Sequence, residues 1–130
     1  MISFDLTKLL EKGLKRKGYK KIGRTDIPGS KGVIYGNNNE IIVLPGLFSP
    51  NKNIPLASRE IQHSFEKYLK KLQTSLEGLL GQKKMRIVFQ GGGELRLPDW
   101  FTRWCETNGI EIEITPPDLR PVGIVEELMY

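Results

Sequence analysis

The chain has very few of the residues that build the commonest metal sites and disulfides. It contains one cysteine, Cys105, and one histidine, His63, among 130 residues. A single cysteine excludes an internal disulfide, and a single histidine excludes any site that needs two histidines from one chain. One unpaired cysteine also agrees with a reducing compartment, so we expect a cytoplasmic protein.

Long apolar runs are missing as well. The longest, such as 41–44 and 87–89, have the length of a strand and fall far short of the roughly 20 residues of a membrane span. The hydrophobic fraction of 38% and the charged fraction of 27% are typical of a globular domain. We therefore expect no membrane segment, one domain over 1–115, and a proline-rich tail over 116–130 with a short apolar segment.

Acidic residues are scarce over most of the chain. Residues 1–90 carry 17 lysines and arginines against 7 acidic residues, whereas residues 91–130 carry 3 against 8. Clustered positive charge attracts polyanions, because each neutralised phosphate releases condensed counterions. The first half is thus expected to bind DNA or RNA through phosphate contacts. The candidate cations are Lys12, Lys15, Arg16, Lys17, Lys20, Lys21, Arg24, Lys67, Lys70 and Lys71.

The same charge asymmetry allows a second interpretation. The basic half could contact an acidic protein, or the acidic half of another copy of this chain. Glu111, Glu113 and the apolar segment 122–130 would then lie at the contact. The sequence therefore leaves two functions open, nucleic-acid binding and protein–protein association.

Apolar periodicity predicts three helices. Leucines at helical spacing predict a first helix over 4–17, ended by Gly18. A long apolar stripe predicts a second helix over 59–80, with Ser58 as its N-cap. A third helix is expected to have Pro98 in its first turn, where proline is well tolerated.

Strands are expected between these helices. The predicted strands cover 19–24, 32–36, 40–44, 85–90 and 110–114. The last of them alternates strictly between isoleucine and glutamate, which predicts one acidic face in water. Together the elements predict an α/β domain with a mixed sheet of four or five strands flanked by three helices, and a short helix in the tail.

Three other features are interpreted as structural. Gly91–Gly93 follow a strand, but the lysine and serine of a nucleotide-binding loop are absent; a small anion bound by 91–97 stays an alternative. His63 lies beside the apolar stripe of a helix. Cys105 follows Trp104 on an apolar face, which is typical of a buried, inert thiol.

Two carboxylates of the basic half suggest an enzymatic form of nucleic-acid binding. Asp26 and Glu40 lie among basic residues, as in divalent-metal nucleases. The order of elements over about 4–114 resembles the core of the PD-(D/E)XK nucleases. In that family an Asp and a Glu-x-Lys on neighbouring strands bind a metal and activate water. The resemblance implies Asp26 and Glu40 as catalytic and metal-binding residues, with Mg²⁺ as the metal. Because Ile42 stands where the lysine is expected, another lysine of the fold would have to replace it.

Overall fold

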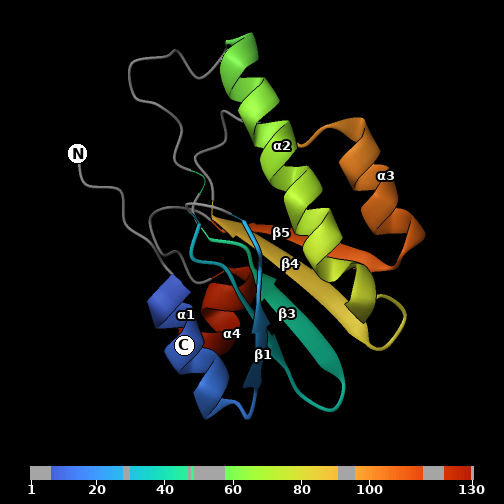
Figure 1. The fold of residues 1–130 in the computed structure, drawn as a ribbon. Helices are drawn as coiled ribbons and strands as arrows, with labels where there is room; N and C mark the ends of the chain where they lie inside the picture. The colour runs from blue at the N-terminus through green and yellow to red at the C-terminus, as the bar shows by residue number, and fades with distance from the viewer. Residues whose placement is uncertain are drawn as a thin grey trace, which may run out of the picture.

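The computed structural model describes residues 7–27, 30–46, 48, 58–90, 96–115 and 122–129. It confirms the predicted α/β class, with a mixed sheet of five strands (Figure 1). None of the helices in these ranges is long and apolar enough to cross a membrane. In chain order the elements are α1 (Thr7–Arg16), β1 (Lys20–Arg24), β2 (Val33–Gly36), β3 (Glu40–Leu44), α2 (Arg59–Leu76), the 3-10 turn η1 (Glu77–Leu79), β4 (Lys84–Gln90), α3 (Asp99–Thr107), β5 (Ile110–Thr115) and α4 (Gly123–Met129).

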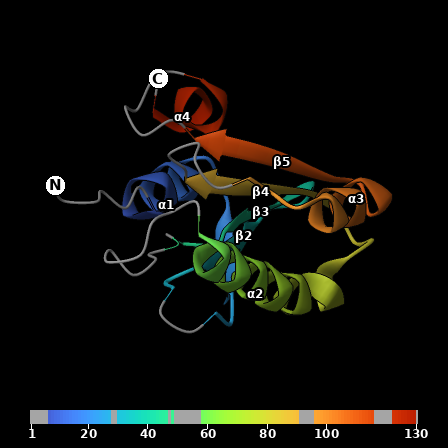
Figure 2. The same cartoon turned by 90° about the horizontal axis from the view of Figure 1, so that it is seen from above.

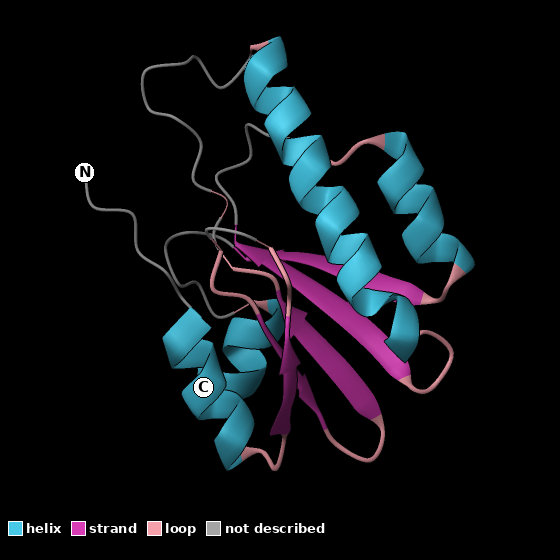
Figure 3. Ribbon diagram, in the orientation of Figure 1, coloured by secondary structure: helices cyan, strands magenta, loops and turns pink. Residues whose placement is uncertain are grey.

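The strands lie in the sheet in their order along the chain, from β1 to β5. The first three form an antiparallel meander, and β4 and β5 run parallel to β3 (Figure 3). The β2–β3 hairpin and the turn from α1 into β1 therefore lie at one end of the sheet, and β3, β4 and β5 all end at the other. The edges of the sheet are β1 and β5.

Helices cover both faces of this sheet, and each face has its own core (Figure 2). Strand side chains alternate between the faces, so adjacent residues of β3 enter different cores. Ile41 and Val43 pack with α2 and α3, on what we call the α2/α3 face. Ile42 and Leu44 pack with α1 and α4, on the α1/α4 face. The central strand β4 contributes to both.

Local signals explain where several elements begin and end. Ser58 caps α2, since its hydroxyl oxygen accepts a hydrogen bond from the Ile61 amide at 3.2 Å. Gly18 follows α1 with a φ of 91°, which glycine adopts without strain. In the hairpin, the side-chain oxygen of Asn37 accepts hydrogen bonds from the amides of Asn39 and Glu40, both at 2.8 Å.

The end of the chain differs from the sequence expectation in two ways. The helix α4 is part of the domain rather than a separate tail, because Ile124 and Val125 are fully buried against α1 and the sheet. The acidic face of β5 is also not simply in water. Glu113 is half-buried beside α4, whereas Ile114 is exposed. Alternation identified the strand correctly but could not show that a helix would cover its acidic side.

The contact between α1 and α4 depends on a glycine. A Cβ atom at Gly13 would lie 2.7 Å from the Cβ of Leu128, so the two helices would have to move apart. Although alanine normally stabilises a helix interior relative to glycine by about 1 kcal/mol, overpacking costs about 1–3 kcal/mol. Because an approach of 2.7 Å between two Cβ atoms is severe, overpacking here should cost about 2–3 kcal/mol, the upper part of that range. We therefore expect Gly13→Ala to lower the free energy of unfolding by about 1–2 kcal/mol in urea denaturation.

A matched control for this prediction is Gly78→Ala. Gly78 lies in η1, and a Cβ there would meet no atom within 4 Å. This variant is expected to be as stable as the wild type or slightly more stable. A Gly13→Ala protein of unchanged or increased stability would show that the two helices do not pack as closely as described.

Candidate nucleic-acid interface

Exposed cations follow one another along one edge of the sheet, at the end of α1 and along β1. In β1 every residue except Gly23 is exposed. Among the residues that the structure describes, none of these cations forms an ion pair with a carboxylate. We name this surface the basic edge, and it consists of Lys15, Arg16, Lys17, Lys20, Lys21 and Arg24.

Local structure explains how the basic edge is presented. Lys15 and Arg16 lie in the last turn of α1, where cations interact favourably with the helix dipole. Arg16 also donates a hydrogen bond to the carbonyl of Leu128 in α4, at 3.1 Å. As an edge strand, β1 pairs only with β2, and a bulge between Lys21 and Gly23 interrupts the pairing. Six predicted phosphate-binding residues thus lie close together at the end of α1 and along the edge strand β1, although Lys20 and Lys21 are on opposite faces of the sheet.

The predicted cations of α2 lie elsewhere. The helix α2 covers the opposite face from α1 (Figure 2). The Lys70 ammonium lies 5.9 Å from the centre of the Trp100 ring in α3, so it is directed away from β1. Lys71 is nearer to the basic edge, because Ser75, one turn later, accepts a hydrogen bond from the Asp26 amide just beyond β1. The ten predicted cations therefore do not form one continuous patch.

A second charged cluster lies on the α1/α4 face and surrounds Arg86 of β4. Its guanidinium is 3.0 Å from a carboxylate oxygen of Glu40, 3.4 Å from Glu113 and 2.9 Å from Glu127. Tyr19 donates a hydrogen bond to Glu40 at 3.1 Å. We name this group the Arg86 cluster; it joins β3, β4, β5 and α4 at one point.

The Arg86 cluster is largely removed from water. The side chains of Arg86 and Glu40 are only 12% and 14% exposed. Burial by itself would lower the pKa of Arg86, but hydrogen bonds to Glu40 and Glu127 outweigh it and raise the pKa above its ordinary value. Arg86 therefore stays charged and forms ion pairs with carboxylates from three other elements. Sequence reasoning did not single out Arg86, although one charged residue inside an apolar strand was a usable signal.

The structure does not bring together the two carboxylates that the nuclease resemblance implied. Glu40 lies at the start of β3 on the α1/α4 face and is held by Arg86 and Tyr19. Asp26 follows β1 at the opposite end of the sheet, where its amide contacts α2. The length of β3 alone, at about 3.3 Å per residue, separates these ends by about 13 Å. Within the described ranges no three His, Cys, Asp or Glu side chains are placed to hold a metal ion.

The environments of Cys105 and His63 in the fold agree with the structural roles expected from the sequence. Cys105 is 1% exposed, and burial raises the pKa of its thiol to about 12, so the thiolate needed for nucleophilic attack does not form near neutral pH. His63 is exposed on α2. Gly91–Gly93 and the segment 116–120 lie outside the described residues.

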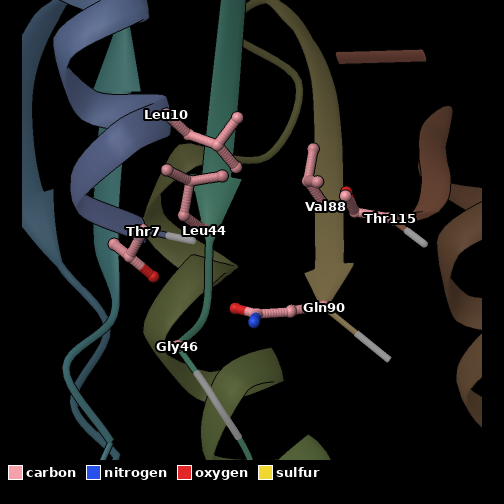
Figure 4. Close-up of a pocket in the computed structure, with 7 residues that line it drawn as sticks. All are labelled: Thr7, Leu10, Leu44, Gly46, Val88, Gln90 and Thr115. Atoms are coloured by element: carbon pink, nitrogen blue, oxygen red, sulfur yellow. The ribbon is translucent and has the colours of Figure 1, made fainter. Parts of the chain in front are cut away.

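A small cavity lies where β3, β4 and β5 end, on the α1/α4 face (Figure 4). Its lining includes Thr7 of α1, Leu44 of β3, Gln90 of β4 and Thr115 of β5. Its volume of about 10 Å³ is enough for roughly one water molecule. The cavity is too small for a substrate or cofactor.

The basic edge and the Arg86 cluster differ in what they can contact. The cations of the basic edge are exposed, so they can reach a partner of opposite charge. The charges of the Arg86 cluster pair with one another, and Arg86, Glu40 and Glu113 are mostly buried, so a partner reaches them less easily. Comparison of the chain with protein-family models, with curated proteins and with solved structures finds no match.

Proposed function

We propose that the protein binds DNA or RNA through the phosphate backbone, with the basic edge as its contact surface. One observation carries the proposal: six exposed cations lie along one edge, and no described carboxylate pairs with them. Phosphate contacts of this kind need no sequence motif, because their free energy comes largely from the release of counterions. We therefore expect tight binding with weak sequence preference.

Among the described residues, Glu111, Glu113 and Glu127 do not cancel this charge, because they pair with cations of β4 and not with the basic edge. Glu113 and Glu127 contact Arg86, and Glu111 lies 3.7 Å from Lys84. The positive field of the basic edge is therefore available to a polyanion.

The proposal concerns binding and assigns no reaction. Glu40 already accepts hydrogen bonds from Arg86 and Tyr19, and Asp26 lies at the other end of the sheet. These two residues do not fit the shared metal site that the nuclease resemblance implied.

The lysines of β1 also have an explanation that needs no ligand. Charged side chains on an edge strand discourage pairing with the edges of other molecules. That role alone predicts no affinity for nucleic acid. The alternative role, protein–protein association, predicts an apparent molecular mass that rises with protein concentration. Binding measurements separate these explanations from the proposed function.

The test is the salt dependence of binding to a fluorescent duplex of about 20 base pairs, followed by anisotropy. If all six cations contact phosphates, the slope of log K against log salt is about −5, since each contact contributes about −0.9. Affinity then falls about a thousandfold between roughly 50 and 200 mM salt. Absence of binding, or a slope near zero, would overturn the proposal. Concentration-dependent mass in sedimentation equilibrium without such binding would favour association.

A further inference from the structure

A shallow hollow of about 400 Å³ lies at one end of the basic edge. It lies between the turn from α1 into β1 and the hairpin that joins β2 to β3, both of which are at the bottom of Figure 1. Its volume is within the usual range for small-molecule sites, about 300–1,000 Å³. We name it the hairpin hollow.

The hairpin hollow has one large apolar side chain in its lining, Ile22. Ile22 is 51% exposed, although three of the other four residues of β1 are cations. Its side chain lies against Gly36 of β2: a Cβ atom at Gly36 would be 3.3 Å from the Ile22 Cδ1. The exposed part of the Ile22 side chain is therefore the apolar surface that the hollow offers to a ligand.

The rim of the hairpin hollow carries two cations and two amides. Lys83 donates a hydrogen bond to the Asn37 carbonyl at 2.7 Å, which holds its ammonium beside the hairpin. Lys20 supplies the second ammonium. The side-chain oxygen of Asn37 is used in the turn, so its NH₂ group is left to donate, and Asn38 is exposed. Side-chain amides can both donate hydrogen bonds to the edge of a base and accept hydrogen bonds from it.

We propose that the hairpin hollow binds one nucleoside monophosphate unit, with its base on Ile22 and its phosphate between Lys20 and Lys83. This inference rests on the proposed function, because the bound unit would be an unpaired or terminal nucleotide of the nucleic acid that the basic edge binds. Proteins that bind single strands usually stack bases on exposed aromatic rings. In the described part of this chain every aromatic ring is buried or half-buried, so Ile22 is the apolar surface that the basic edge offers to a base.

The experiment compares adenosine monophosphate with inorganic phosphate in NMR titrations of the intact chain. We expect the nucleotide to bind at least about fivefold more tightly and to shift the Ile22 methyl signals and the Gly36 amide. Ile22→Ser should remove this advantage without changing the affinity for inorganic phosphate. The matched control is Ile114→Ser, because Ile114 is 54% exposed on the opposite edge of the sheet. Equal affinities for the two ligands, or equal effects of the two variants, would overturn the assignment.

Duplexes with blunt ends and with one unpaired nucleotide separate this inference from the proposed function. An Ile22-dependent preference for the unpaired end supports the hairpin hollow as a subsite for nucleic acid. Salt-dependent binding of both duplexes, with no nucleotide binding, overturns the subsite and leaves the proposed function standing. Nucleotide binding without duplex binding assigns the hollow to free nucleotides and overturns the proposed function.

Discussion

Replacing Arg86 by methionine is expected to lower the free energy of unfolding by about 3–5 kcal/mol at neutral pH. Removal of one partner from a buried ion pair leaves the other charge without compensation, and the loss is of this size. Glu40 and Glu113, only 14% and 22% exposed, would both lose their cation. Glu127 is 54% exposed and can turn toward water, so it adds less to the loss. Adding Glu40→Gln to Arg86→Met should recover part of the lost stability.

The control for this prediction lies on the same strand. Lys84 pairs with Glu111 at 3.7 Å, but both side chains are more than half exposed. Exposed ion pairs contribute about 0–1 kcal/mol, so Lys84→Met should change stability by less than about 1 kcal/mol. Urea unfolding followed by tryptophan fluorescence measures both variants. Similar small losses in the two variants would mean that the Arg86 cluster does not hold β3, β5 and α4 together.

The Arg86 cluster also shows which part of the fold the sequence could not reveal. The hairpin turn, the Ser58 cap and the apolar stripe of α2 depend on residues a few positions apart, so they could be predicted. The partners of Arg86 depend on strand order and register instead. Glu40 is 46 residues away along the chain and Glu113 is 27. No local pattern indicates that these charges meet.

The candidate interface could be predicted only in part, because its local contacts can be read from the sequence and its long-range contacts cannot. The cations of α1 and β1 are close in sequence, and one turn at Gly18 keeps them together in space. Lys67 and Lys70 were grouped with them by charge alone. The sheet places α2 on its other face, because α2 lies in the crossover between the parallel strands β3 and β4, and sequence periodicity does not encode that pairing.

Removing three positive charges from the basic edge is expected to weaken duplex binding strongly and to reduce its salt dependence. In the triple variant Lys20→Gln, Lys21→Gln and Arg24→Gln, the slope of log K against log salt should become shallower by about 3. Affinity for the duplex at about 0.1 M salt should fall by at least about a hundredfold, since each lost phosphate contact also loses its counterion release. The substituted side chains are exposed, so the fold should be unaffected.

A matched control removes the same charges from α2. Arg59→Gln, Lys67→Gln and Lys70→Gln also replace one arginine and two lysines, and all three side chains are exposed. The net charge of the chain is the same in both triple variants. Only the place from which the charge is removed differs.

The salt slopes of these two variants, measured by anisotropy on one duplex, test the account most directly. We predict a slope shallower by about 3 for the β1 variant and by less than about 1 for the α2 variant. Equal slopes in the two variants would show that net charge, and not the basic edge, determines binding.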